Sequence, residues 1–372
     1  MQRSDRSGEA GRADEARRDR RRRLRSATIP AAALTSLVLL ASPLAAQGVV
    51  QWHGYAQLRY GRADAVTGFS ARRAKLWMKG PVPGVAHLSF KVQGIFRNGA
   101  SGAFVLQDVF ADYGGPRAKV RVGQFVPAFS LQRSQPDYLI PLMERAAVVE
   151  TLIPGAGSMG RDIGAQIILA PGSRAVRLDL GLFDGLEGNR SAGREGDFLT
   201  TGRFTLAANV GSGAKASLGG SVAWRRTHGA DVGVLSTAGP SFAGNDFRWG
   251  GDARLAGPGW EVQGEYLHAD LAAEASHGFY VLGDVAVSRR DDLALSVQQL
   301  TTPDAAVHPD PWYVAGFTHL FGGEDFRAHG GKPGKTGRAR ALPTKLTGDV
   351  RCQFNEGKPT VGAAVQFQVF LH

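Results

Sequence analysis

The chain has 372 residues, 50 of which are glycine, and a formal charge of +11 at neutral pH. A glycine share well above the usual value of about 7% argues against a helical protein and favours many turns and close strand contacts. Residues 1–26 supply ten Arg against five acidic residues, so the rest of the chain is only mildly basic at +6, and no nucleic-acid reading motif accompanies that charge.

The first segment has the pattern of a secretory signal peptide. An arginine-rich run, RRDRRRRLRS, precedes a short apolar stretch, ATIPAAALTSLVLLASPLAA, which ends in small residues. We expect cleavage near Ala46–Gln47, so that 1–46 is the signal peptide and 47–372 the mature domain. A transmembrane anchor is the competing interpretation, but the apolar run is short and contains proline. The single cysteine, Cys352, excludes intramolecular disulfides in an exported chain of this kind.

From Gln47 onward, apolar and polar residues alternate with a period of two. In WEVQGEYLH, Trp260, Val262 and Tyr266 share one face, and glutamate or glutamine occupies the other. Strict alternation of this kind predicts strands with one apolar and one polar face. About sixteen such segments follow one another, near 49–60, 69–79, 85–97, 104–113, 117–125, 161–170, 174–184, 198–210, 214–226, 244–255, 259–270, 276–288, 291–302, 311–321, 343–354 and 360–371.

Segment and connection lengths favour a membrane barrel. Many segments are about 10 to 12 residues long, above the 5 to 6 of an ordinary soluble strand and close to the 9 to 11 of a tilted strand crossing a bilayer. Short connections (171–173, 256–259) alternate with long ones (126–160, 227–243, 322–342), which is typical of outer-membrane barrels with one rim of turns and one of loops. We predict an all-β fold, a transmembrane antiparallel β-barrel of about 16 strands; the count stays open between fourteen and sixteen, because the fifteenth segment is poorly patterned. A large soluble β-sandwich or propeller is the alternative, but it explains such charged polar faces poorly.

Two motifs with chemical associations lack the context that they need. Gly155, Gly157 and Gly160 have the GxGxxG spacing of dinucleotide sites, but a proline precedes them and a strand pattern follows. The nine histidines are scattered without a metal-binding spacing, and no nucleophile is paired with a base. We therefore expect no cofactor, no metal and no enzymatic activity.

The polar faces of the early strands carry cations. In FSARRAKLWMKG, Leu76 and Met78 lie on the apolar face, whereas Arg72 also falls there, which predicts a position near a membrane interface, where a charge costs little. In a closed barrel the polar faces line the lumen, so their cations point into one water-filled space that concentrates anions. Inward carboxylates such as Asp108 make simple charge balancing the alternative. The predicted anion path consists of Arg73, Lys75, Lys79, Lys91, Arg97, Lys119 and Arg121.

Five motifs occur in order between Ala71 and Arg145: ARRAKLWMKG, LSFKVQG, LQDVFADY, VRVGQFVPAFSLQRSQ and LMERA. Together they resemble the phosphate-selective porin O and P family. The resemblance implies a sixteen-stranded barrel in the outer membrane of a Gram-negative-type bacterium, in contact with its lipid and assembled as a homotrimer. It also implies a long loop that folds into the lumen and a basic constriction that favours anions such as phosphate or polyphosphate.

By the same resemblance, residues 126–160 after the fifth strand are the infolding loop. Arg133 and Arg145 become the constriction candidates, and the alternative is that Arg145 pairs with Glu144 or a lumen aspartate to hold the loop. We expect 322–342 to be a mobile basic loop. The expected function is passive, anion-preferring diffusion of small solutes, without a nucleic-acid partner. A plugged structural or adhesive barrel and a soluble exported β-protein that binds acidic glycans are the two alternatives.

Overall fold

The computed structural model describes the greater part of the chain after the predicted signal peptide. Three features expected from the sequence lie outside the described residues: the signal peptide 1–46, the basic loop 322–342 and Gly157 of the glycine motif. No described helix is long and apolar enough to cross a membrane. The described residues are 50–63, 66–97, 104–155, 160–170, 175–186, 188–189, 197–211, 213–230, 232–237, 242–272, 274–304, 306–307, 309–321, 344–355 and 358–371.

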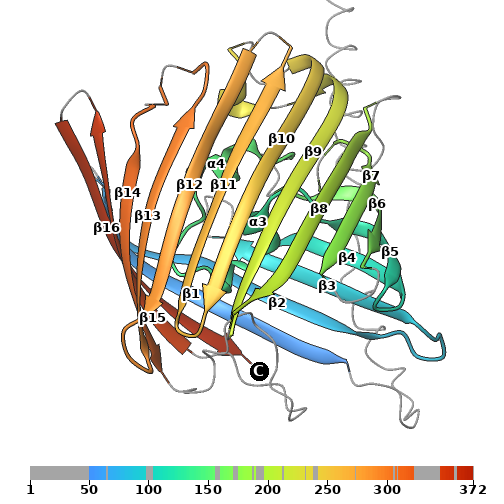
Figure 1. Cartoon of the computed structure of the whole chain (residues 1–372), viewed down its shortest axis with the longest axis horizontal. Helices are drawn as coiled ribbons and strands as arrows, with labels where there is room; N and C mark the ends of the chain where they lie inside the picture. Colours follow the sequence, from blue (N-terminus) through green and yellow to red (C-terminus); the bar gives the residue numbers. More distant parts are fainter. Residues whose placement is uncertain are drawn as a thin grey trace, which may run out of the picture. The chain divides into compact units, whose positions relative to one another are not determined.

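The described residues form sixteen strands in one closed antiparallel sheet (Figure 1). Each strand pairs with its neighbours in sequence, and β16 closes the ring by pairing with β1. The predicted all-β barrel is therefore confirmed, with the poorly patterned fifteenth segment as a full strand. The strands are Gln51–Ala63 (β1), Val66–Pro81 (β2), Leu88–Arg97 (β3), Phe104–Gly114 (β4), Ala118–Phe125 (β5), Asp162–Leu169 (β6), Val176–Phe183 (β7), Leu199–Val210 (β8), Ala214–Ala230 (β9), Phe242–Gly257 (β10), Trp260–Leu271 (β11), Glu274–Ala286 (β12), Asp291–Thr301 (β13), Trp312–Phe321 (β14), Thr344–Asn355 (β15) and Lys358–Leu371 (β16).

Side chains alternate along the strands between an apolar outer face and a polar inner face. On β11, Val262 and Tyr266 are exposed, whereas Gln263 and Glu265 are buried. A soluble protein shows the opposite polarity, because water excludes apolar side chains from its surface. The outer wall of this sheet is therefore suited to lipid, and its inner wall to a hydrated or hydrogen-bonded interior.

The antiparallel order assigns each connection to one of two rims. The connections that follow odd-numbered strands lie at one rim, and these include 126–161 and 231–241. The two-residue turn 258–259 lies at the opposite rim, as do the ends of β14 and β15 that 322–343 joins. The expectation that the long connections share one rim is therefore wrong for this last one, because it follows an even-numbered strand.

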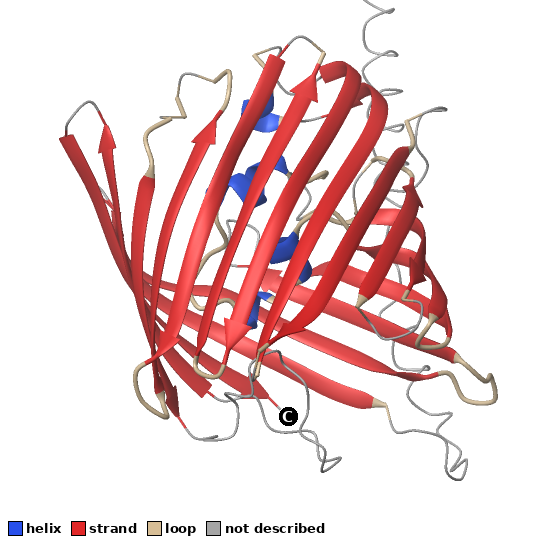
Figure 2. Ribbon diagram, in the orientation of Figure 1, coloured by secondary structure: helices blue, strands red, loops and turns tan. Residues whose placement is uncertain are grey.

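The connection from β5 to β6, residues 126–161, contains three short helices: α3 (Leu131–Ser134), η1 (Asp137–Leu139) and α4 (Ala147–Leu152). A further short helix, η3 (Gly233–Leu235), follows β9. The helices are drawn within the ring of strands (Figure 2), and α4 contacts β11, β12 and β13. We call residues 126–161 the inner segment.

An apolar core lies between α4 and this part of the wall. Val148, Val149 and Leu152 of α4 are fully buried, as are Leu267 and Ala269 of β11. These apolar positions interrupt the polar inner face that strict alternation predicts. They bind the inner segment to one side of the barrel, and they leave the polar inner faces of β1 to β7 beside the remaining space.

Aromatic side chains join the closing seam of the barrel to η1. Tyr55 of β1 lies with its ring centroid 5.7 Å from that of Phe370 on β16 and 5.8 Å from that of Tyr138. Trp77 of β2 stacks on Tyr138 at 6.0 Å with the ring planes 3° apart. Phe370 is out of register with the apolar face of its strand, and this cluster shows why: its ring packs against inward-facing partners.

Two β-bulges redirect polar side chains beside the inner segment. Arg72 is the extra residue where β2 pairs with β1, and Gln107 is the extra residue where β4 pairs with β3. A bulge sets two residues opposite one and re-aims a side chain. The expected lipid-side position of Arg72 is therefore wrong, since its Nε donates to Glu144 of the inner segment at 2.9 Å.

Candidate functional site

A cavity of about 590 Å³ lies between the inner segment and the inner faces of β1 to β7. Ten basic side chains and four carboxylates line it, so the wall carries a clear excess of positive charge. A water-filled space whose low-dielectric wall carries net positive charge concentrates anions. The lining basic residues are Arg72, Arg73, Lys75, Lys79, Lys91, Arg121, Arg133, Arg145, Arg161 and Arg177, and the carboxylates are Asp108, Asp137, Glu144 and Glu150.

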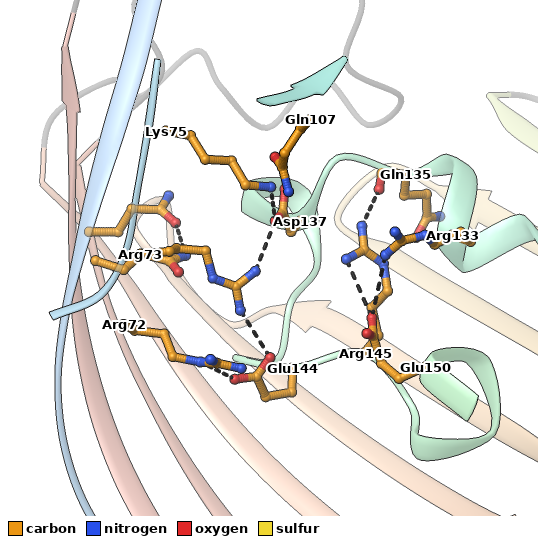
Figure 3. Close-up of polar contacts among 12 residues, drawn as sticks. Arg72, Arg73, Lys75, Gln107, Arg133, Gln135, Asp137, Glu144, Arg145 and Glu150 are labelled. Atoms are coloured by element: carbon orange, nitrogen blue, oxygen red, sulfur yellow. Dashed lines mark hydrogen bonds and ion pairs between the residues drawn. The ribbon is translucent and has the colours of Figure 1, made fainter. Parts of the chain in front are cut away.

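Glu144 gathers three guanidinium groups from the wall, two of which Figure 3 shows. Arg59 of β1 and Arg72 and Arg73 of β2 approach its carboxylate oxygens at 2.7, 2.9 and 3.1 Å. Burial alone raises the pKa of this carboxyl, but the three positive charges outweigh burial and lower the pKa of Glu144 to about 2. The ionised carboxylate therefore ties the inner segment to β1 and β2.

Asp137, at the start of η1, is the second carboxylate on this side. Arg73 Nη1 donates to its Oδ2 at 2.8 Å, and Lys75 Nζ donates to the same oxygen. Burial raises the pKa of Asp137, but Lys75, Arg145 and Arg73 outweigh it and hold the pKa well below the usual value. Arg73 and Lys75 are thus neutralised by the inner segment, although both line the cavity.

Three further residues of the predicted path are paired with aspartates of the wall. Lys91 Nζ donates to Asp108 at 2.7 Å. Lys119 and Arg121 share Asp112, at 2.8 Å from Lys119 Nζ and 2.7 Å from Arg121 Nε. At these positions the structure has the arrangement of the charge-balancing alternative.

The last two residues of the predicted path differ from these. Lys79, near the end of β2, is exposed, lines the cavity and makes no ion pair with any described carboxylate. Arg97 ends β3 opposite Arg73, and its side chain lies outside the described part of the chain. Lys79 is therefore the predicted path residue whose charge faces the cavity without a described counter-ion.

Arg145, one of the two constriction candidates, is held by the inner segment itself. Its Nε donates to the carbonyl of Gln132 at 3.2 Å and its Nη2 to that of Gln135 at 2.6 Å. The expected alternative pairing with Glu144 is not what the structure contains, because Glu144 binds the wall instead. The remaining nitrogen, Nη1, lies 3.7 Å from Glu150.

Arg133, the other candidate, belongs to α3, whose N-cap Ser130 accepts a hydrogen bond from the Arg133 backbone N–H. Its side chain is 8% exposed, and its Nη1 also lies 3.7 Å from Glu150. Its Nε and Nη2 have no hydrogen-bond partner among the described residues. Burial, followed by the charges of Arg161 and Arg145, lowers the pKa of Arg133 to about 9, so the group stays cationic at neutral pH.

Two far-wall residues fix the inner segment from the opposite side. Glu265 of β11 accepts hydrogen bonds from Ser130 Oγ at 3.0 Å and from the backbone N–H of Leu131 at 3.2 Å, at the start of α3. Arg248 of β10 donates from Nη1 to the carbonyl of Ile153 at 2.7 Å, at the end of α4. Each contact satisfies backbone groups that a short helix leaves unpaired at its ends.

A second cavity, of about 960 Å³, adjoins the first. Its lining residues come from β1, β2, the inner segment and β13 to β16. Arg72, Glu144, Arg145 and Glu150 line both cavities, so the two spaces meet at these residues. We call these four residues the neck.

Comparison with known proteins decides the family. The sequence profile of the phosphate-selective porin O and P family matches residues 48–277, more than half of the chain. The chain belongs to this family. It is therefore an outer-membrane porin of a Gram-negative bacterium. A search of the curated proteins finds no match.

Solved structures share the fold of this porin at low identity. The anion-selective porin from Comamonas acidovorans has a TM-score of 0.60 and 13% identity over 87% of this chain and 100% of its own. OmpF of Salmonella typhi, in complex with daunomycin, has a TM-score of 0.58 and 11% identity over 87% and 98%. OmpT of Vibrio cholerae, in its trimer form, has a TM-score of 0.54 and 11% identity over 88% and 100%. Identities this low establish the fold alone.

Arg161 and Glu150 are among the charged residues of the porin's cavity that sequence reasoning did not single out. Arg161 lies directly before β6, and its Nε donates to Asp108 at 2.9 Å. Glu150 lies in the first turn of α4 beside Arg133 and Arg145. The position of Arg161 at the start of a strand pattern is a signal in the sequence, whereas nothing in the pattern around Glu150 indicates that it faces the cavity.

Proposed function

We propose that this porin provides passive, anion-preferring diffusion of small solutes, including phosphate or polyphosphate, and that it catalyses no reaction. The observation that carries the proposal is the charge of the cavity, where ten basic side chains face four carboxylates. Several of these cations form ion pairs. The positive electrostatic potential of the cavity therefore comes from the excess of basic over acidic side chains and not from any single residue. Family membership supports the same preference.

We further propose that the inner segment is the constriction loop and that Arg133 and Arg145 act at its narrowest part. Arg145 is a neck residue and Arg133 lines the cavity of about 590 Å³, and each has one nitrogen turned toward Glu150. Guanidinium groups suit phosphate because their planar donors match its oxygens, whereas a lysine such as Lys79 acts as a point charge. Several weak sites in series permit both entry and release, which conduction requires.

The test of this function is the sign of selectivity. In a planar bilayer with a potassium chloride gradient, we expect stepwise conductance and a reversal potential of the sign that shows chloride to be more permeant than potassium. Added phosphate should reduce the chloride current, because it competes for the same cations. A reversal potential on the cation side would overturn the anion preference, and a complete lack of steps would favour the plugged barrel, for which the apolar core around α4 is the supporting observation.

We also propose a homotrimer whose exposed apolar outer face contacts outer-membrane lipid. Support comes from the trimer form named for OmpT of Vibrio cholerae and from family membership. Light scattering of the detergent-solubilised porin, corrected for bound detergent, should give three times the mass of the mature chain. A mass of one chain under conditions that preserve the barrel would contradict the trimer.

A further inference from the structure

Glu150 differs from the other three carboxylates of the cavity. Asp108, Asp137 and Glu144 each accept charged hydrogen bonds at 3.1 Å or less, and their side chains are 9%, 16% and 22% exposed. The side chain of Glu150 is 51% exposed, and its nearest cations, Arg133 and Arg145, both stand at 3.7 Å. That distance is beyond a hydrogen bond, so the attraction is Coulombic and solvated.

The two guanidiniums are, in contrast, fixed. Arg145 is held through Nε and Nη2 by the carbonyls of Gln132 and Gln135, which leaves Nη1 directed toward Glu150. Arg133 is nearly buried, and its Nε–Nη2 edge rests against Gly160, where an added Cβ would lie 3.0 Å from both nitrogens. Only Nη1 of Arg133 faces the carboxylate. Two held donors thus face one half-exposed acceptor.

We propose that Glu150 is an exchangeable counter-ion that a permeating oxyanion displaces from Arg133 and Arg145. This rests on the proposed anion-preferring function and assigns a specificity-determining residue within it. In the empty porin the Glu150 carboxylate neutralises the two Nη1 groups. When an oxyanion such as phosphate arrives, its oxygens take the same two donors, and the half-exposed glutamate side chain swings toward water.

The exchange explains how two nearby guanidiniums avoid trapping their ligand. A fixed pair of desolvated arginines binds an oxyanion strongly and releases it slowly. A tethered carboxylate competes for the same donors, lowers the affinity and speeds release. Glu150 therefore weakens anion binding at the neck, and its removal strengthens it.

The decisive variant is Glu150→Gln, which keeps the size of the side chain and removes its charge. In single channels carrying chloride, the concentration of inorganic phosphate that halves the current should fall roughly three- to tenfold, and individual phosphate blocks should last correspondingly longer. Glu150→Ala should shift in the same direction. Glu274→Gln is the matched control: it removes the same charge from a carboxylate at the start of β12, which accepts a hydrogen bond from Thr237, and it should behave as wild type.

A second background separates the local exchange from a general gain in positive charge. In Arg133→Gln, the additional change Glu150→Gln should alter the half-blocking concentration by less than about twofold, because one of the two donors is gone. The proposal is overturned if Glu150→Gln blocks like wild type, or if its effect persists in full without Arg133. A wild-type porin that prefers cations is a different result: it overturns the proposed function and, with it, this inference.

Discussion

Replacing Glu144 by glutamine should loosen the inner segment from β1 and β2 and make the channel noisy. Three guanidiniums, those of Arg59, Arg72 and Arg73, share this carboxylate, and an amide cannot satisfy them. We expect the free energy of unfolding to fall by about 2–3 kcal/mol, as for other lost hydrogen bonds to charged groups. Single-channel recordings should show frequent spontaneous closures, and urea titration of the refolded barrel should measure the loss of stability.

A matched variant and a pH series test the cause. Glu261 of β11 binds Arg254 through two hydrogen bonds, away from the inner segment, so Glu261→Gln should leave the current quiet. Because the pKa of Glu144 is lowered to about 2, its contribution is present in full above the unfolded value near 4.5 and is lost as pH falls toward 2. The wild type should therefore stay quiet at pH 5 and above and become noisy between about pH 4.5 and 2. Quiet channels in Glu144→Gln would contradict this anchoring role.

Replacing Asp246 by asparagine should have the larger effect on stability. Its carboxylate binds Arg225 at 2.9 Å and Arg248 at 2.7 Å, and all three side chains are at most 3% exposed. Removing one member of a buried charge network leaves the other charges unpaired, which typically costs about 3–5 kcal/mol. Since Arg248 also holds the carbonyls at the end of α4, the inner segment should become accessible to protease in the folded barrel.

The comparison for Asp246→Asn is Asp270→Asn on the neighbouring strand. The Asp270 side chain is 46% exposed and, among the described residues, forms an ion pair only with His268, so its loss should change the free energy of unfolding by less than about 0.5 kcal/mol. Urea titrations of both variants in the same detergent give the difference directly. Equal decreases in the free energy of unfolding for the two variants would mean that the buried network around Asp246 stabilises the barrel no more than an exposed ion pair does.

The barrel itself was predictable because its signal is local. Alternation of apolar and polar residues needs only the strand geometry, and segment length needs only the thickness of the bilayer. Each of the sixteen predicted segments overlaps a strand, down to Thr344–Asn355, where Gly348 and Cys352 blur the pattern. The inward aspartates, such as Asp108 beside Lys91, followed from the same periodicity.

The contacts of the site were not predictable in the same way. A bulge shifts the register by one residue, so Arg72 points inward although the alternation places it outside. Glu144 pairs with Arg73 and not with Arg145 because of the position that the inner segment takes against the wall. No local sequence pattern encodes that position. The position of the inner segment depends in turn on inward apolar residues such as Leu267, which in the sequence look like exceptions to the polar inner face of their strand.

The aromatic contacts at the closing seam link the closure of the barrel to the positioning of η1. Tyr55 comes from the first strand, Phe370 from the last, and Tyr138 from the inner segment between them. Tyr138 therefore finds its full platform only after the last strand has paired with the first. The pairing of β16 with β1 therefore both closes the wall and completes the aromatic contacts of η1, so a barrel that is open at this seam lacks part of the support that positions its neck.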